Sequence, residues 1–319
     1  MSPFFPDADD PGYDVHPDDE PARDLLDFLD EDEPEYDWLV PGLLERGDRL
    51  ILTGPEGGGK STLLRQLADQ LGAGIDPFTL DKIDPVRVLV VDLENSRRHV
   101  RRELRPLRIQ AGDRLERGQV RIVIEPAGID LFGHAPDVTW LGDRIDAAKA
   151  ELVLIGPLYK LATGAPTSEE VARKVTAALD RLPADHGFAL IMEAHSPHAA
   201  QGGRRPERPY GASLWMRWPE FGLYLDKNGQ LSHWRGARDE RDWPEALRRG
   251  GPWPWSPETD PREALWKRIR AYVDHNGRTA SVRTLALALG RGKSTVQRAI
   301  EAHESEWQDL RASLGSVDE

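Results

Sequence analysis

The sequence contains no cysteine, only three methionines and no apolar run long enough to cross a membrane as a helix. Without cysteine the chain can form no disulfide, no thiolate nucleophile and no cysteine-ligated metal site. The N-terminus also lacks the pattern of a signal peptide. We therefore expect a soluble cytoplasmic protein in a reducing compartment, with no membrane partner.

Basic residues are almost absent from the first 37 positions, which carry fifteen Asp and Glu against one Arg. This balance of −14 accounts for the net charge of −13, so the remaining chain is near +1 and its charge does not exclude nucleic acid. Residues 1–36 are rich in proline and poor in apolar residues, which predicts a disordered acidic tail. The apolar residues Leu25, Leu26, Phe28 and Leu29 indicate a transient helical turn; the alternative is a docking segment or DNA-mimicking arm.

Residues 49–64, RLILTGPEGGGKSTLL, combine a short apolar strand, an exposed glycine-rich turn and the start of an amphipathic helix. This is the phosphate-loop pattern G-x-x-x-x-G-K-S in the strand-turn-helix context that it requires. Glycines let backbone N–H groups surround phosphate oxygens at the positive end of the following helix. Lys60 would then reach the β- and γ-phosphates, and Ser61 would ligate Mg²⁺. We predict that a nucleotide is bound by Gly54, Pro55, Glu56, Gly57, Gly58, Gly59, Lys60, Ser61 and Thr62.

Further apolar runs of strand length alternate with helical segments along residues 37–245. The alternation predicts an α/β fold with a mostly parallel sheet and helices on both of its faces. The predicted strands after the phosphate loop are 87–91, 120–124, 152–155, 188–192, 222–225 and 231–234. The predicted helices after the phosphate-loop helix are 97–108, 137–150 and 171–182.

Polar residues follow these strands at their carboxyl ends, where open α/β sheets place ligand chemistry. The strand 87–91 leads into Asp92, Glu94 and Asn95, and the strand 188–192 leads into Glu193 and His195. Glu94 could be a mere surface carboxylate, but if the bound nucleotide is hydrolysed, a base is needed near the γ-phosphate and this position would supply one.

The phosphate loop, the segment Asp92–Asn95, the segment Gly156–Lys160 and the segment Glu193–His195 together resemble the RecA-like P-loop ATPases. The resemblance covers roughly residues 36–242, and within this group it points to the plasmid RepA-type branch of hexameric helicases and to related phage and actinobacterial ATPases. It implies a RecA-like core, ATP hydrolysis with Mg²⁺, assembly into a homo-oligomeric hexameric ring, and action on DNA.

The resemblance also implies roles for individual residues. Glu94 would be the catalytic glutamate that polarises water, and His195 the sensor of the γ-phosphate, although a histidine at a strand end can also be merely hydrogen-bonded. Arg235 and Arg238 would be fingers that reach the nucleotide of a neighbouring subunit, unless they pair with the local acidic residues. The arginines of the loop 199–210 would contact DNA, unless they are only solvated charge: Arg204, Arg205 and Arg208.

One position departs from the family pattern. The resemblance leads us to expect an aspartate for the Mg²⁺ water shell at the end of the strand 152–155, but the residue is Gly156. Either Asp92 replaces it and acts with Ser61, or hydrolysis is slow. If Asp92 is the substitute, a Gly156→Asp variant would lower the Mg²⁺ requirement, provided that the backbone accepts a side chain.

The C-terminal residues change in character. Residues 246–261 are dense in Trp and Pro and indicate an extended linker that packs by its aromatics. Residues 262–319 then predict three helices: the first begins after Asp260 as its N-cap, the second spans 281–289 and is capped by Gly290, and the third begins at Ser294. A helix, a short glycine turn and a second helix are typical of a helix-turn-helix or winged-helix domain. From Lys267 to Arg298 there are eight basic residues against one acid. The predicted DNA-contacting side chains are Lys293, Thr295, Gln297 and Arg298; a helical module for protein contact is the alternative.

Two functions follow from these patterns. The first is an ATP-hydrolysing motor that acts on DNA, a helicase or a helicase-associated replication or recombination ATPase. The second is a nucleotide-switched DNA-binding regulator without unwinding activity.

Overall fold

The computed structural model describes residues 24–30, 36–182, 187–199, 205–236, 241–289 and 291–314. The chain divides into two compact units, residues 1–37 and 38–319. In the first unit, the described residues form one short helix, α1 (Leu25–Leu29), and the carboxylate of Asp24 accepts the Leu26 N–H. Leu25 and Leu26 are exposed. Most of the predicted acidic tail lies outside the described residues, so its disorder stays a prediction.

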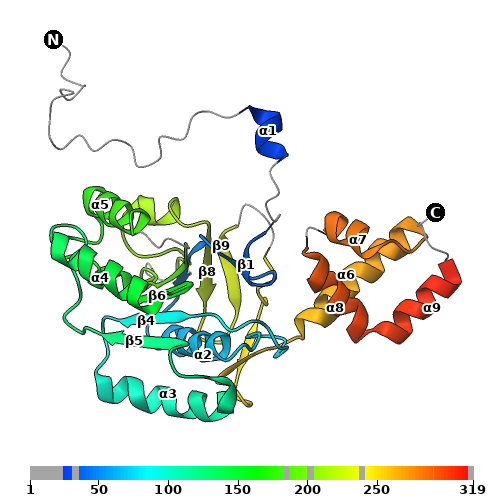
Figure 1. Ribbon diagram of the computed structural model, residues 1–319, viewed down its shortest axis with the longest axis horizontal. Helices are drawn as coiled ribbons and strands as arrows, with labels where there is room; N and C mark the ends of the chain where they lie inside the picture. The colour runs from blue at the N-terminus through cyan, green and yellow to red at the C-terminus, as the bar shows by residue number, and fades with distance from the viewer. Residues whose placement is uncertain are drawn as a thin grey trace. The chain divides into compact units, whose positions relative to one another are not determined.

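A seven-stranded sheet forms the centre of the second unit (Figure 1). Its strand order is β5-β4-β6-β7-β3-β8-β9, and every pair is parallel except β8 with β9. The predicted α/β fold with a mostly parallel sheet, as in a RecA-like core, is therefore confirmed. The strands are β3 (Arg49–Thr53), β4 (Val88–Asp92), β5 (Val120–Ile124), β6 (Leu152–Gly156), β7 (Ala189–Glu193), β8 (Phe221–Leu225) and β9 (Leu231–Arg235).

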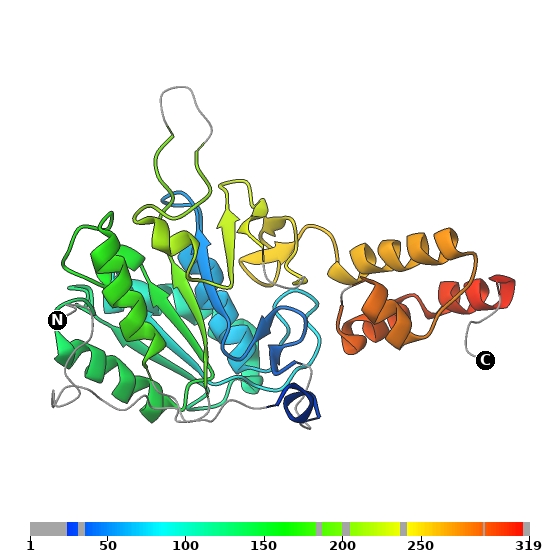
Figure 2. The same ribbon diagram turned by 90° about the horizontal axis from the view of Figure 1, so that it is seen from above.

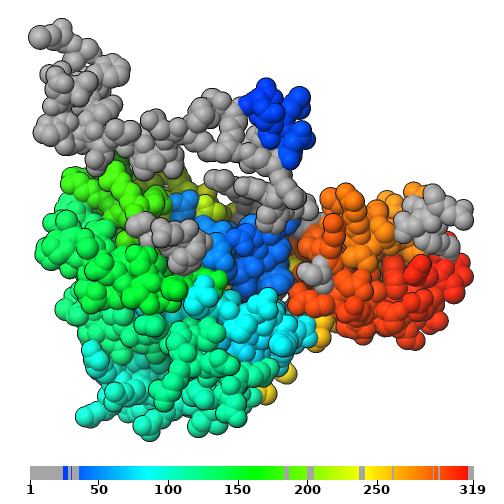
Figure 3. Space-filling view, in the orientation of Figure 1, coloured from blue at the N-terminus to red at the C-terminus, as the bar shows by residue number. Residues whose placement is uncertain are grey.

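Helices cover both faces of this sheet, because alternate strand side chains point to opposite faces (Figures 1 and 2). Leu50 and Leu52 of β3 belong to the apolar core that includes α2, whereas Ile51 belongs to the core with α4 and α5. In the space-filling view α4 and α5 appear green and α3 blue-green (Figure 3). The helices are α2 (Lys60–Gly72), α3 (Arg97–Ala111), α4 (Ala135–Ala148) and α5 (Glu169–Asp180).

Shorter elements complete this α/β region. An antiparallel pair of strands precedes β3, and three short 3-10 helices lie in the connections. They are β1 (Trp38–Val40), β2 (Leu44–Glu45), η1 (Gly112–Arg114), η2 (Leu158–Lys160) and η3 (Ser213–Met216).

The predicted linker 246–261 packs by its aromatics and also contains a β-hairpin that the sequence analysis did not predict. Strands β10 (Leu247–Arg249) and β11 (Trp255–Pro257) pair antiparallel. Trp255 is only 2% exposed and packs in the same apolar core as α2. Both backbone groups of Trp255 bond to the buried amide of Gln66 on α2, at 2.8 Å each. The hairpin is thus attached to the helix that follows the phosphate loop.

Four helices follow the hairpin and share an apolar core of their own, which includes Leu265, Ile269, Leu285, Val296 and Trp307. The first begins as predicted, with the carboxylate of its N-cap, Asp260, accepting a backbone N–H in the first turn. The last of the four was not predicted. They are α6 (Pro261–Asn276), α7 (Val282–Leu289), α8 (Lys293–Ala302) and α9 (Glu304–Leu314). The predicted cap Gly290 lies outside the described residues.

The carboxylate of Asp69 on α2 is buried, and among the described residues its Oδ2 has no hydrogen-bond partner. Burial raises the pKa of Asp69 from 3.8 to about 7, although Arg108 acts in the opposite direction. The folded chain therefore keeps a proton that the unfolded chain releases above about pH 4. The Asp69 carboxyl therefore lowers the free energy of unfolding as the pH rises from about 4 to about 7.

We expect Asp69→Asn to raise the free energy of unfolding at pH 8 by on the order of 2–4 kcal/mol, because the amide carries no charge to bury. Near pH 4 the gain should vanish. Urea denaturation of both proteins at pH 4.5, 6 and 8 measures the difference. A gain that is the same at all three pH values would contradict the raised pKa.

Candidate nucleotide-binding site

The phosphate loop turns sharply between β3 and α2, and two of its glycines are required by close contacts. A Cβ on Gly54 would lie 2.3 Å from the carbonyl oxygen of Leu225 on β8. A Cβ on Gly59 (φ +95°) would lie 2.7 Å from the indole ring of Trp255. The hairpin therefore packs directly against the loop. Trp255 Nε1 donates to the carbonyl of Gly59 at 3.2 Å, and Arg249 Nη2 donates to that of Gly58 at 3.0 Å.

Lys60 opens α2 and bends back over the loop. Its Nζ donates to the carbonyl oxygens of Gly54 at 3.2 Å and Pro55 at 3.0 Å. Glu56 and Gly57 of the turn are exposed, as expected, but Lys60 itself is only 3% exposed. Burial lowers the pKa of Lys60 below its ordinary value, and the nearby carboxylate of Glu193 offsets part of this effect. The ammonium group lies where the glycine turn would bring phosphate oxygens.

The carboxylate next to Ser61 comes from β7. Glu193 Oε1 accepts a hydrogen bond from the Ser61 hydroxyl at 3.1 Å and lies 3.7 Å from Lys60 Nζ. The sequence analysis had noted Glu193 at a strand end without giving it a role. The glycine at position 156 could have pointed to Glu193, because a site that lacks the expected acid on one strand can take an acid from the end of the neighbouring strand.

Asp92, the predicted substitute for the missing acid, lines the same small pocket as Ser61 but is engaged elsewhere. It forms a buried ion pair with Arg65 at 2.9 Å and accepts the backbone N–H groups of Glu94 and Asn95. Burial alone would raise the pKa of the Asp92 carboxyl, but the hydrogen bonds from Asn95 and Arg65 outweigh it and hold the pKa below its usual value. Asp92 shapes the turn that presents Glu94.

Glu94 is exposed at the edge of this pocket and is bound by Tyr159. The Tyr159 hydroxyl donates to Glu94 Oε1 at 3.0 Å, and its ring stacks on the His195 ring with centroids 5.8 Å apart. Burial raises the pKa of Tyr159 to about 12, aided by the carboxylates of Glu94 and Glu193. Tyr159 thus connects the two predicted catalytic residues; the sequence analysis gave it no role.

The donor set at this site suits Mg²⁺, which prefers oxygen ligands and keeps several waters when it binds nucleotide phosphates. It offers the Ser61 hydroxyl with the Glu193 carboxylate beside it. Over the described ranges, no group of three or more His, Asp or Glu is spaced to hold a metal ion by itself.

Comparison with known protein families fits this geometry. A family model described as an AAA domain matches residues 17–201, more than half of the chain. The chain belongs to this AAA domain family. It is therefore a P-loop ATPase, and the family implies that it binds ATP, typically with Mg²⁺. No curated protein matches the chain. In the parts of the chain that the structure describes, no helix is long and apolar enough to cross a membrane.

The loop after β7 of the AAA domain contains the predicted DNA-contacting arginines. Arg205 is tied to the phosphate loop: its guanidinium lies 3.0 Å from Glu56 Oε2 and donates to both the hydroxyl and the carbonyl of Ser196. Arg208 is exposed. Arg204 lies outside the described residues. A cavity of about 350 Å³ beside this loop is lined by Glu56, Tyr159, His195, Ser196, His198 and Tyr210, among others.

One of the two predicted fingers belongs to the last strand of the sheet. Arg235 ends β9, and its Nη1 donates to the Met216 carbonyl of the same chain at 2.7 Å. Arg238 lies outside the described residues. Arg235 therefore has an intramolecular partner, which a contact with a neighbouring subunit would have to replace.

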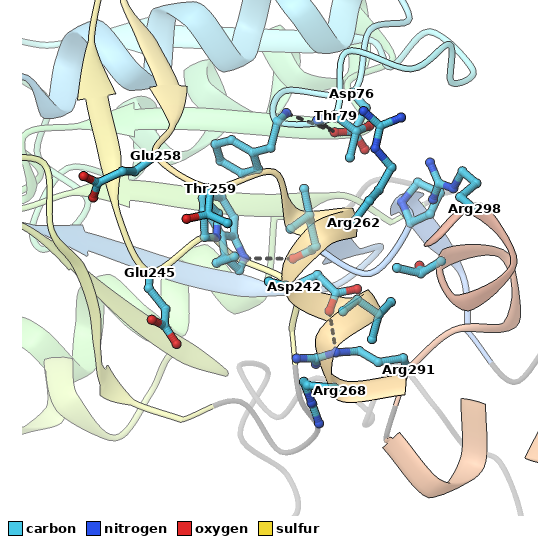
Figure 4. A pocket seen from close by; sticks show the side chains of 18 of the residues that line it. Asp76, Thr79, Asp242, Glu245, Glu258, Thr259, Arg262, Arg268, Arg291 and Arg298 are labelled. Carbon is cyan, nitrogen blue, oxygen red and sulfur yellow. Dashed lines mark hydrogen bonds and ion pairs between the residues drawn. The ribbon is translucent and has the colours of Figure 1, made fainter. Parts of the chain in front are cut away.

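The four predicted DNA-contacting residues of α8 do not share one surface. Lys293 and Gln297 are exposed, whereas Thr295 and Arg298 line a cavity of about 550 Å³. Figure 4 shows Arg298 from α8 and Arg262 from α6 directed into this cavity. Arg262 and Arg298 both approach the carboxylate of Asp81, at 3.5 and 3.8 Å.

Proposed function

We propose that this AAA domain protein is an ATP-hydrolysing motor that acts on DNA, of the RepA type, as a helicase or a helicase-associated replication or recombination ATPase. One observation carries the proposal. Arg205, in the loop proposed to touch DNA, binds both Glu56 of the phosphate loop and Ser196, the neighbour of His195. A conformational change of the phosphate loop on ATP hydrolysis would therefore be transmitted to the DNA-contacting loop by the side chain of Arg205.

The residues of the chain divide the chemistry between them. The phosphate loop and Lys60 bind and orient the β- and γ-phosphates. Mg²⁺, when bound beside Ser61, neutralises charge on the phosphates. Glu94 orients the attacking water, and Tyr159 holds the carboxylate in place through its hydroxyl. His195, stacked on Tyr159, lies where it can sense the same event.

The proposal includes a homo-oligomer, with a hexameric ring as its form. Arg235 and Arg238 would then face the nucleotide of the next subunit, after Arg235 exchanges its bond to Met216 for that contact. A stabilising charge supplied by a neighbour makes turnover depend on assembly. Measuring ATPase activity against protein concentration, beside the mass of the particle in solution, tests this part.

The main experiment compares ATP turnover by the full chain without DNA, with single-stranded DNA and with duplex DNA, together with a strand-displacement assay. The motor proposal expects DNA to stimulate turnover and expects displacement that stops when ATP is withheld. Binding of ATP and Mg²⁺ without turnover on any DNA would exclude the motor.

The alternative, a nucleotide-switched DNA-binding regulator, is supported by the hairpin. Strands β10 and β11 bind the phosphate loop at Gly58 and Gly59, and only three residues separate β11 from α6. Nucleotide binding could thus bias the C-terminal helices without any unwinding. ATP-dependent binding to one duplex sequence, with no strand displacement, would favour the regulator.

Both functions predict that the exposed side of α8 binds DNA. We expect the double variant Lys293→Ala/Gln297→Ala to weaken duplex binding several-fold and to reduce the salt dependence by about one released counterion, since one cation is removed. The matched control is Lys267→Ala on α6, also an exposed lysine. Equal losses in both proteins would mean that α8 makes no specific contribution and would favour a protein-contact module.

A further inference from the structure

The missing carboxylate at Gly156 coincides with an additional one on the neighbouring strand. Strand β7 lies between β6, which ends at Gly156, and β3, which leads into the phosphate loop. In the ladder, Glu193 of β7 pairs with Leu52 of β3, one residue beyond the pairing of Met192 with Ile155. Glu193 is therefore the immediate neighbour of Gly156, one strand closer to the phosphate loop.

The two positions cannot both carry a normal side chain. A Cβ built on Gly156 would lie 2.6 Å from the Cβ of Glu193 and 3.2 Å from its Cα and N. Non-bonded carbon atoms have their optimal separation near 3.5–4.0 Å, so one strand would have to move. Gly156 has no positive φ that would itself demand glycine. The side chain of Glu193 therefore explains why residue 156 is a glycine.

Glu193 is also held at the position where the carboxylate is needed. It is 8% exposed, accepts the Ser61 hydroxyl hydrogen bond and lies 3.7 Å from Lys60 Nζ. Buried carboxylates in proteins are paired with hydrogen-bond donors or cations, and Glu193 has one of each. Asp92, by contrast, is engaged by Arg65 and by the turn before Asn95.

We propose that Glu193 is the acid that orders the water shell of nucleotide-bound Mg²⁺ in this protein, a role moved from the end of β6 to the end of β7. The inference rests on the proposed function, because it concerns the metal of an ATP-binding site. It corrects the sequence expectation for Gly156→Asp: that single variant should lose metal affinity, because its side chain collides with Glu193.

The test measures Mn²⁺ as a probe for Mg²⁺, by electron paramagnetic resonance, on the full chain with a non-hydrolysable ATP analogue. Glu193→Gln keeps the size and the acceptor for Ser61 but removes the charge. We expect its Mn²⁺ affinity to fall about 10–100-fold, the usual loss for an outer-shell carboxylate. Affinity for a fluorescent ATP analogue in EDTA should change far less.

Two further variants make the result specific. Asp92→Asn should change Mn²⁺ affinity less than Glu193→Gln does. The double variant Gly156→Asp/Glu193→Gly returns the acid to β6 and removes the clash, so it should regain affinity relative to Gly156→Asp alone. A Glu193→Gln affinity within twofold of the original protein, or a larger loss in Asp92→Asn, would overturn the inference. If the unmodified protein bound no ATP analogue, the proposed function itself would fail.

Discussion

Replacing Lys60 with alanine is expected to abolish ATP turnover, with a fall of at least about 100-fold in kcat/KM, the usual loss when one charge-stabilising donor is removed. The ammonium group lies inside the phosphate loop on the carbonyls of Gly54 and Pro55, and alanine removes it from that position. A coupled ATPase assay measures the loss, and binding of a fluorescent ATP analogue shows how much of it is affinity.

Controls are needed because Lys60 is buried rather than exposed, so its removal also takes away core volume and leaves Glu193 without its ammonium neighbour. Lys60→Met keeps most of the volume, and circular dichroism checks the fold of both variants. Lys174→Ala, at an exposed lysine of α5, is the matched control and should retain turnover. Undiminished hydrolysis by a folded Lys60→Met protein would refute the assignment.

Glu94→Gln should have the second large effect: ATP binding is retained while kcat falls about 10²–10⁴-fold, the range that a positioned general base contributes. The amide is isosteric and its oxygen can still accept the Tyr159 hydroxyl, so the local geometry should persist. Single-turnover hydrolysis and analogue binding on the same preparation separate the two effects.

The matched control for Glu94 is Glu116→Gln, the same substitution at an exposed glutamate before β5. It should leave both binding and turnover as they are. Hydrolysis at the original rate by Glu94→Gln would mean that another group activates the water. A loss of ATP affinity equal to the loss of rate would assign Glu94 to binding instead.

The sequence predicted the sheet well because each buried parallel strand is a nearly continuous apolar run, as in Val88–Asp92 and Leu152–Gly156. It could also place Glu94 and His195 together, since the carboxyl ends of parallel strands share one edge of the sheet. These inferences need only the order of elements along the chain. They do not need the relative positions of individual side chains.

Contacts across strands are the part that sequence could not supply. The closeness of Glu193 to Gly156 depends on the register between β7 and β6, and its bond to Ser61 depends on which strand lies next to β3. Residues 247–257 form three-residue strands interrupted by prolines, so no alternating pattern marked them as a hairpin. The spacing of apolar residues in α8 also could not predict that Arg298 would face Asp81, because Asp81 is far away in the sequence.

The hairpin also determines how short an autonomous ATPase fragment of this chain can be. The family match ends at residue 201, but a fragment cut there would lack β8, β9 and the hairpin. A cut after Arg241 would still strip Trp255 from the core and leave the amide of Gln66 buried without the backbone partners it has now. The smallest fragment that keeps the hairpin's contacts with α2 and the phosphate loop therefore extends to Pro257. This is well beyond residue 201, where the family match ends.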